Sequence, residues 1–342
     1  RGHSGDLDRR GDRAALAGLG ASHTGRYEPD RIDYFELLDI FRFAARDELK
    51  RLFPPEGRVT YPGIGMVAAE IDGRLFATDV YHAGPAARAG VREGDEILAV
   101  AGEPYREIGS FEDKVGDEVS VRLRRSEGAE PIEIPVEIEA IRPNVMFTAS
   151  VERSARTIER DGRTIGYIRL WSYTSRQTNE VLAREISSGR LKDADGLVLD
   201  LRSRWGGAPA DAAEFFVGGT PDMRLVGRER RASHANVRWR KPVVAIIDGG
   251  TRSGLEIFAY ALKENGIPLV GTRTAGAVLA GTAFLLPDDS MLLLAVADVL
   301  TDGKRLEGTG VSPDVVVERD IRFANGADAQ LDAALEAIGR RL

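Results

Sequence analysis

Cysteine is absent from the 342 residues, and histidine occurs only four times, at His3, His23, His82 and His234. Without cysteine the chain can form no disulfide, thiol nucleophile or cysteine metal site, although this leaves its redox compartment open. No two histidines have the H-E-x-x-H spacing of a helical zinc site, so we expect neither a metal nor a cofactor. Any histidine chemistry must use one of these four residues.

Excess positive charge and long apolar runs are also missing. The net charge is −7, which leaves no electrostatic footprint for nucleic acid. We expect no membrane span, because no apolar run is long enough to cross a bilayer. A signal peptide is not visible, but a mature form would already have lost it. Export therefore stays open, and we favour a periplasmic or extracytoplasmic location over a cytoplasmic one.

A strand, a turn and a helix follow one another around Ser253. Val243–Ile247 is apolar and β-branched, which predicts a strand buried on both faces. Helix spacing starts again just after Ser253, at Leu255, Phe258, Ala259 and Leu262. Such a position lifts a hydroxyl out of the sheet beside the first helical N–H groups. Ser253 and Glu256 also have the S-x-x-E form of a capping box, so spacing alone leaves both interpretations open.

The second half of the chain alternates strand and helix patterns, which predicts an α/β core with a mostly parallel sheet. A strand pair is expected at residues 145–163. Further strands are expected at 164–170, 196–201, 243–247, 269–271 and 283–300, with helices at 179–186, 210–217 and 255–262. Ligand sites in such sheets lie at the carboxyl ends of the strands. Gly206, Gly207 and Ser253 all fall at that edge.

The first 57 residues read as an N-terminal helical segment. Residues 1–13 resemble a frayed terminus, and a short helical piece is expected at 14–19. Ser22 and His23 lie in a polar loop of small residues. A longer helix is predicted over residues 34–52, ended by Pro54 and Pro55.

Residues 58–143 form short strands separated by frequent turns. The stretch 84–95, G-P-A-A-R-A-G-V-R-E-G-D, resembles the signature of a PDZ domain. Gly63, Ile64, Gly65 and Met66 match that family's carboxylate-binding loop, which offers N–H groups to a peptide's C-terminus, while the next strand accepts the peptide by β-augmentation. A generic small β domain is the alternative interpretation.

Several motifs in the right order make the whole chain similar to the C-terminal processing proteases and their tricorn relatives. They are the PDZ unit, the L-D-L-R…G-G stretch at 199–207, the strand–Ser253–helix unit, V-G-T-R-T-A-G at 270–276 and G-T-G-V-S-P-D at 308–314. The resemblance implies a crotonase-like ββα core. The domains expected are 1–57, 58–143 and a peptidase core at 144–342.

The resemblance also assigns site residues. Most such proteases use a serine–lysine dyad with the lysine in T-x-G-K, but Ala277 stands there in this chain, and Lys241, Lys263 and Lys304 lie outside that motif. The tricorn-type branch instead uses a histidine preceded by serine, and a later glutamate, which Ser22, His23 and Glu307 match. By motif position the amides of Gly207 and Gly254 form the oxyanion hole. Alternatively, Ser22 is an ordinary loop residue and Glu307 a surface charge.

These residues predict a serine endopeptidase acting on peptides or unfolded proteins, whose PDZ domain recognises substrate C-termini. Ser253 attacks, His23 is the base, and Ser22 with Glu307 orients the imidazole. Asp200 and Arg202 are expected to position the loop rather than react, Trp205 is expected to wall the cleft, and His234 is the reserve base. Two alternatives remain: a PDZ peptide-binding protein that has lost activity, and a serine hydrolase of non-peptide acyl groups. The substrate and the oligomeric state stay open.

Overall fold

The computed structural model describes residue 16 and residues 18–219, 224–226, 228, 232–234 and 237–342. The expected frayed terminus and most of the helical piece at 14–19 lie outside these residues. The chain forms two compact units. The first unit comprises Arg1–Met146, Ala277–Glu307 and Asp320–Ala327, and the second comprises Phe147–Gly276, Gly308–Arg319 and Asp328–Leu342. The domain boundaries predicted from the sequence stay a prediction.

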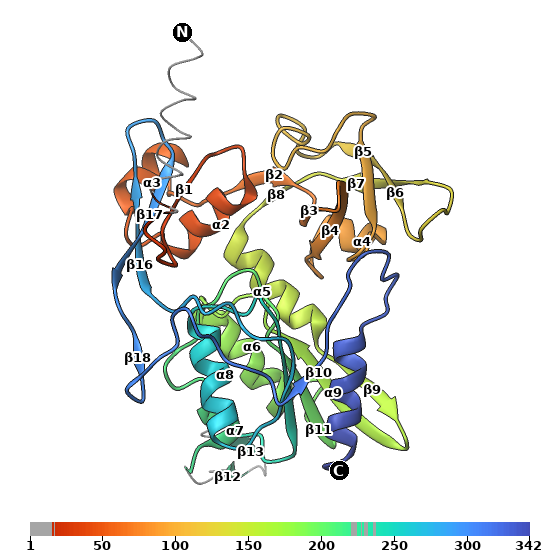
Figure 1. Ribbon diagram of the computed structural model, residues 1–342, viewed down its shortest axis with the longest axis vertical. Coiled ribbons are helices and arrows are strands. Elements are labelled where there is room, and N and C mark those ends of the chain that lie inside the picture. The colour runs from red at the N-terminus through yellow and green to blue at the C-terminus, as the bar shows by residue number, and fades with distance from the viewer. Residues whose placement is uncertain (1–15, 17, 220–223, 227, 229–231, 235–236) are drawn as a thin grey trace. The chain divides into compact units, whose positions relative to one another are not determined.

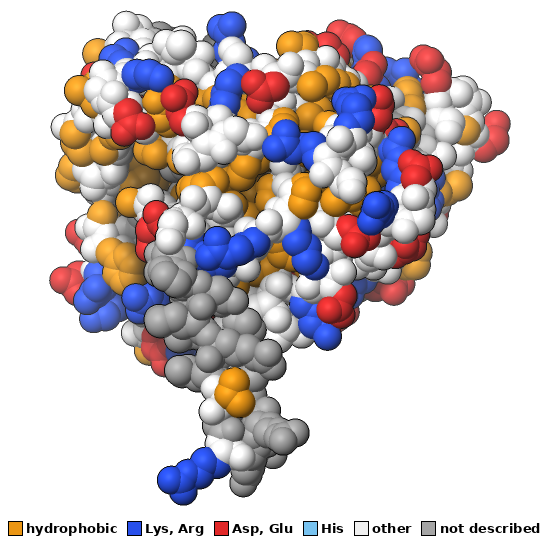
Figure 2. Space-filling view, turned by 90° about the horizontal axis from the view of Figure 1, so that it is seen from below, with side chains coloured by type: hydrophobic (Ala, Val, Ile, Leu, Met, Phe, Trp, Pro, Cys, Tyr) orange, Lys and Arg blue, Asp and Glu red, His pale blue; other side chains and the backbone are white. Residues whose placement is uncertain are grey.

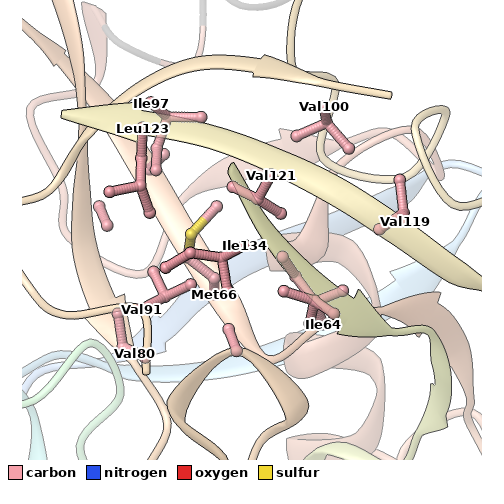
Figure 3. Close-up of a cluster of buried hydrophobic side chains, with 14 of the residues drawn as sticks. Ile64, Met66, Val80, Val91, Ile97, Val100, Val119, Val121, Leu123 and Ile134 are labelled. Carbon is pink, nitrogen blue, oxygen red and sulfur yellow. The ribbon is translucent and has the colours of Figure 1, made fainter. Parts of the chain in front are cut away.

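A five-stranded antiparallel sheet in the first unit matches the predicted small β domain. Its order is β3 (Met66–Ile71), β4 (Arg74–Val80), β5 (Glu96–Val100), β6 (Glu118–Arg124) and β7 (Ile132–Glu137), with the short helix α4 (Pro85–Ala89) packed against β7. Buried and exposed residues alternate along β6, as the two-residue period of a strand requires. Val121 and Leu123 point from β6 into the core that Ile64 and Met66 also fill (Figure 3). The strand β3 lies at the edge of this sheet.

Smaller sheets complete the first unit. The strand β1 (Gly25–Tyr27) pairs with β17 (Met291–Ala297), which pairs with β16 (Ala280–Leu285). Two further pairs join β2 (Tyr61–Gly63) to β8 (Glu139–Ile141) and β18 (Leu300–Thr301) to β19 (Lys304–Arg305). The segment that carries Ser22 and His23 therefore continues into a strand held by residues from the far end of the sequence.

The helix predicted over residues 34–52 is two helices, so that prediction is wrong in its middle. They are α2 (Ile32–Ile40) and α3 (Arg46–Leu52). A buried face through Phe35 and Leu38 would need its next apolar residue at position 42, where Arg42 stands. The chain turns there instead and leaves Phe43 70% exposed, with the Arg42 guanidinium 4.6 Å from its ring centroid.

A six-stranded sheet forms the centre of the second unit (Figure 1). Its order is β20 (Val315–Val316), β15 (Leu269–Gly271), β14 (Val243–Ile247), β11 (Gly196–Asp200), β10 (Arg163–Arg169) and β9 (Arg156–Arg160). The β9–β10 pair is antiparallel, and the other four pairs are parallel. All residues of β11 and β14 are buried, as expected for strands covered on both faces.

The helices of this unit lie on the faces of that sheet. In Figure 1, α6 (Arg176–Ser187) and α8 (Gly254–Glu264) lie on the side away from α9 (Ala329–Gly339), which packs against β11, β14 and β15. The helix expected at 210–217 is confined to α7 (Glu214–Val217), and β12 (Arg224–Val226) pairs with β13 (Ala232–His234).

Residues 145–163 are not a strand pair throughout, which corrects the sequence-based prediction. They begin in the helix α5 (Pro143–Ser154), and only β9 follows as strand. Buried residues recur at 143, 146, 147, 150, 151 and 154, which is the period of a helix face. Pro143 suits the first turn, where its missing N–H has no partner to lose.

The described helices include none that is both long and apolar enough to cross a bilayer. Acidic and basic side chains are interspersed over the face seen in Figure 2, with hydrophobic ones between them. This mixed surface agrees with a net charge of only −7 over 342 residues.

A buried guanidinium joins the end of β11 to the start of α9. Arg202 is 2% exposed and donates to Asp200 Oδ2 at 2.6 Å, to Asp328 Oδ2 at 2.7 Å and to Gln330 Oε1 at 3.1 Å. Asp328 is the N-cap of α9 and also accepts from the Leu331 N–H. Burial alone would raise the pKa of Asp200, but the Arg202 charge and its hydrogen bonds hold that pKa well below the usual range.

Asp200→Asn should lower the free energy of unfolding by about 3 kcal/mol or more, because Arg202 would keep a buried charge with one partner fewer. The depressed pKa makes the contribution of Asp200 complete above the ordinary aspartate pKa of about 3.9 and lost as pH falls below it. Urea unfolding of wild type and variant at pH 7 and pH 3 measures both effects. The control is Asp193→Asn, whose side chain is 84% exposed and which should change stability by less than about 0.5 kcal/mol. A loss at pH 7 no larger than in this control would contradict the prediction.

Candidate active site

The turn after β14 is fixed by its own polar groups. Asp248 Oδ1 accepts from the Gly250 N–H at 2.9 Å and from the Thr251 N–H at 3.2 Å. Thr251 Oγ1 donates to the Leu201 carbonyl, 3.0 Å away at the end of β11. The turn is therefore attached to the neighbouring strand, which limits where Ser253 can lie.

Ser253 itself has a backbone conformation that a side chain resists. Its φ is 55° and its ψ −132°, and α8 begins at the next residue. A non-glycine residue with positive φ outside the left-handed helical region costs on the order of 1–3 kcal/mol and is found mainly where function requires it. A sharp strand-to-helix turn of this kind exposes the nucleophilic serine in unrelated hydrolases.

The Glu256 carboxylate fixes this turn through hydrogen bonds. Its carboxylate is completely buried and accepts from the Ser253 N–H at 3.2 Å, the Gly276 N–H at 2.7 Å and Thr274 Oγ1 at 2.5 Å. The sequence revealed Glu256 only as the second member of a capping box. The structure contains this capping box. The Glu256 N–H also donates to the Ser253 main-chain carbonyl, at 2.9 Å. A capping serine accepts through Oγ, so capping would leave its hydroxyl proton available to a base.

Glycines allow a second loop to approach Ser253 closely. A Cβ atom on Gly206 would lie 2.5 Å from Ser253 Cβ, and one on Gly254 would lie 2.6 Å from the Ala208 nitrogen and 2.8 Å from the Gly207 carbonyl carbon. Gly207 has φ +81°, and a Cβ there would lie 2.6 Å from Thr174 Cγ2. The main chains of Gly207 and Gly254 thus lie against each other beside Ser253, a place that no other residue type could fill without a shift.

A second group of polar residues, Ser22, His23 and Glu307, lies in the first unit. Ser22 Oγ lies 2.8 Å from Glu307 Oε2 and 3.0 Å from His23 Nδ1, and the Ser22 N–H donates to Glu307 Oε1 at 3.0 Å. Glu307 also accepts from the Val278 N–H at 2.7 Å. At 9% exposure Glu307 is buried, so its interpretation as a surface charge is wrong.

The hydrogen bonds define the tautomer of His23. Burial alone would raise the pKa of Glu307, but the Val278 and Ser22 amides, the Ser22 hydroxyl and the Leu279 amide together lower it, so the carboxylate is ionised near neutral pH. An ionised carboxylate only accepts, and the single Ser22 hydroxyl proton is therefore donated to Glu307. Ser22 Oγ must then accept from Nδ1–H of His23, which puts the basic lone pair of the neutral imidazole on Nε2.

The remaining candidates are distributed as follows. Ser22, His23 and Glu307 belong to the first unit, and Ser253, Gly207 and Gly254 belong to the second. Gly63, Ile64, Gly65 and Met66 are all buried, in the first unit. Trp205 is buried beside the glycine loop at 8% exposure.

Lys241 and Lys263 donate to the carbonyls of Ala194 and Ser312. The described residues hold no cluster of three or more His, Asp and Glu able to bind a metal.

The Glu307 carboxyl should titrate below the ordinary glutamate pKa of about 4.3, and Ser22→Ala should raise its midpoint, because the lost hydroxyl donor favoured the charged form. Its depressed pKa stabilises the fold above the ordinary value and ceases to do so as pH falls through the folded value. Carboxyl carbon chemical shifts between pH 2 and pH 7 measure the midpoint. Thr24→Ala is a neighbouring control, since Thr24 Oγ1 donates to the Ser22 carbonyl rather than to Glu307. An unchanged midpoint in Ser22→Ala would contradict the assigned direction of this hydrogen bond.

Comparison with known proteins adds independent information. Residues 164–317 match the model of peptidase family S41, and residues 76–125 match a PDZ domain model. The carboxyl-terminal-processing protease of Synechocystis is 30% identical over 276 residues, which cover 74% of this chain and 62% of that protein. The carboxy-terminal processing protease CtpA of Bacillus subtilis is 28% identical over 282 residues, covering 76% of this chain and 56% of the relative.

A solved structure supports the fold alone. A putative S41 protease from Bacteroides fragilis superposes with a TM-score of 0.57 at 19% identity, covering 82% of this chain and 83% of that one. The chain spans only 56–62% of the lengths of the two curated relatives. The resemblance to the C-terminal processing proteases that the motifs predicted is confirmed by the family-model match and by these relatives.

Proposed function

Since residues 164–317 match the model of peptidase family S41 and residues 76–125 match a PDZ domain model, we propose that this protein is a serine endopeptidase that cleaves peptides or unfolded proteins. The observation that carries the proposal is the strained turn at Ser253, set against the main chains of Gly207 and Gly254. The parallel strand pairs that surround this turn support the crotonase-like ββα interpretation of the core. An exported location is part of the same proposal.

In the proposed mechanism, Nε2 of His23 takes the proton of Ser253 Oγ as that oxygen attacks the scissile carbonyl. The Gly207 and Gly254 N–H groups stabilise the oxyanion that develops, and glycine at both positions lets the substrate approach the main chain closely. His23 then returns the proton to the leaving amine, and water hydrolyses the acyl-enzyme by the same steps in reverse order.

Ser22 and Glu307 are proposed to orient the imidazole. Their hydrogen bonds hold Nδ1 as the donor, so the imidazolium formed during attack is stabilised by a neutral hydroxyl and, beyond it, by a carboxylate. This places the basic lone pair on Nε2 without a lysine. The tricorn-type scheme is thus supported over the serine–lysine dyad, whose lysine position is Ala277 and is 5% exposed.

The two alternatives differ in what they leave unexplained. An inactive PDZ peptide-binding protein has no use for strain at Ser253 or for an orienting network on His23. A hydrolase of non-peptide acyl groups would use the same nucleophile but would not need a PDZ domain. Incubation with a denatured protein, followed by mass spectrometry of the products, separates the endopeptidase from both alternatives, because only the endopeptidase yields internal peptide cuts. Labelling of Ser253 by a serine-reactive probe separates the two alternatives, because an inactive binding protein would not react.

Ser253→Ala should reduce peptide cleavage by about 10⁴-fold or more while the protein stays folded, since no other group supplies the nucleophile. Ser253→Gly should be equally inactive yet more stable than Ser253→Ala, because glycine adopts the observed φ and ψ without strain. Thermal melts and turnover measured on the same samples test both statements. If Ser253 were only an N-cap, Ser253→Ala would lose about 0.5–2 kcal/mol of stability and keep its activity per folded molecule.

The pH dependence of kcat/KM should show one ionisation at about 6 to 7.5 and then level off, because a histidine base must be neutral and unperturbed histidine titrates near about 6.5. His23→Ala should remove this ionisation together with nearly all activity. Glu307→Gln should be milder, since it keeps a hydrogen-bonding group but loses the charge. Initial rates at low substrate concentration from pH 5 to pH 9 measure each profile.

Ala277→Lys serves as the control for the other catalytic scheme. It restores the residue type of the dyad motif, but Ala277 is only 5% exposed, so its surroundings hold a methyl group and would have to shift to accept the longer lysine side chain. It should not rescue His23→Ala. If the rise of kcat/KM with pH persisted unchanged in His23→Ala, His23 would not be the base. Attention would then turn to His234 or to a lysine outside the motif.

We also propose that the PDZ domain captures substrate C-termini through Gly63, Ile64, Gly65 and Met66. This proposal is supported by the edge position of β3, which leaves one side of that strand for a peptide to pair with. A carboxylate at the end of the peptide would meet main-chain N–H groups of the loop before β3.

A further inference from the structure

The loop assigned to carboxylate binding is closed in this structure. All four of its residues are buried, with Ile64 and Met66 each 1% exposed. Ile64 and Met66 point into the core of the domain (Figure 3), and the Ile64 and Gly65 carbonyls accept from the Ala86 and Tyr81 N–H groups. A peptide terminus therefore needs a neighbouring element to move before it can reach this loop.

The loop contacts β8 and the start of α4, and helix α2 contacts residues beside it. Tyr81, whose N–H donates to Gly65, uses its hydroxyl to donate to Glu36 Oε1 of α2 at 2.7 Å. Glu36 and Tyr81 are both at most 1% exposed. Phe35 directly precedes Glu36, and its ring centroid lies 5.4 Å from that of Tyr61, two residues before the loop. A buried carboxylate on α2 is thus attached to the loop through a single tyrosine.

The turns between β5 and β6 make two further contacts, one with the start of α2 and one with the loop. Glu107, in the turns between β5 and β6, accepts from the Ile32 N–H at 2.8 Å and pairs with Arg31 at 2.7 Å, at the start of α2. In the same turns, the Tyr105 hydroxyl donates to the Met66 carbonyl at 3.3 Å. Met66 is the first residue of the edge strand β3. Its carbonyl, which could accept from a peptide paired with this strand, therefore already accepts from Tyr105.

We propose that α2 is a latch that covers the C-terminus-binding loop of the PDZ domain, and that Glu36 and Phe35 are the residues that hold it closed. A substrate C-terminus is captured only by molecules in which α2 has released Tyr81 and Tyr61. This inference rests on the proposed capture of C-termini, and adds its regulation. Because only the released fraction binds, the apparent affinity of the wild type is lower than the intrinsic affinity by that fraction.

Linkage makes the effect reciprocal: a captured peptide must favour the released form of α2 by as much as release favours capture. The helix follows the Ser22–His23 segment by only a few residues, with β1 between them. The latch therefore connects the state of the PDZ domain to the chain segment that carries the proposed base.

The test uses the full chain and a ten-residue peptide with an apolar last residue, made with a free carboxylate and as its amide. Tyr81→Phe removes the hydrogen bond to Glu36 with little change of shape, and Phe35→Ala removes the ring contact with Tyr61. Both variants should bind the acid peptide about tenfold more tightly than wild type, or better, because a hydrogen bond to a charged group is lost only from the closed form. Phe43→Ala, which removes an exposed ring in the turn between α2 and α3, is the control and should bind like wild type.

Hydrogen exchange gives a readout that does not depend on the variants. The acid peptide should speed exchange of the amides of residues 32–40 in the wild type while it slows exchange in residues 63–71, and the amide peptide should do neither. Equal affinity of all variants for the acid peptide, or protection of 63–71 without faster exchange in 32–40, would overturn the latch. Failure of every variant to prefer the acid peptide would overturn both the latch and the capture of C-termini, whereas the serine peptidase proposal would fail only if Ser253→Ala kept its activity.

Discussion

The main chain at Ser253 is the constraint on which the second unit depends. A φ of 55° and ψ of −132° at a residue with a side chain persist only if the surroundings fix the turn more strongly than the strain opposes it. The turn is fixed from three directions, by Asp248 and Thr251 within it, by Glu256 from the first turn of α8, and by the glycine loop after β11. The Ser253 hydroxyl enters these contacts as the acceptor of the capping box, which does not use its proton. The structure thus fixes the position of that oxygen while leaving its chemistry available.

Carboxylates that accept main-chain N–H groups serve both units in the same way. Glu256 accepts from Gly276 in the second unit, and Glu307 accepts from Val278 and Leu279 in the first. The donors are nearly consecutive in the sequence, on either side of Ala277. The stretch that carries a catalytic lysine in the dyad branch is here used to position two glutamates. One of them supports the proposed nucleophile, and the other supports the proposed base.

The sequence was sufficient wherever a pattern was local. The strands of the second unit, the turn at Ser253 and the small β domain follow from apolar runs, glycines and helix spacing, and the Ser22–His23–Glu307 contacts were anticipated only because motif order supplied a partner 285 positions away. The pattern failed where a single residue decided the outcome. Arg42 interrupts a face that otherwise reads as one helix, and the short apolar run after Pro143 suited a strand as well as a helix. Burial of Glu256 and Glu36 could not be predicted, because a glutamate in a helix is usually solvated.

The division of the chain into units has a consequence for how the protein folds. The chain passes from one unit to the other after Met146, Gly276, Glu307, Arg319 and Ala327. Neither unit is therefore a continuous piece of sequence, and each can be completed only after residues far apart in the sequence have both been synthesised. Contacts between such distant residues form slowly, because loop closure must precede any stabilisation by packing. The apolar strands synthesised early are therefore exposed until their later partners follow, and transiently exposed apolar surface of this kind is prone to aggregation.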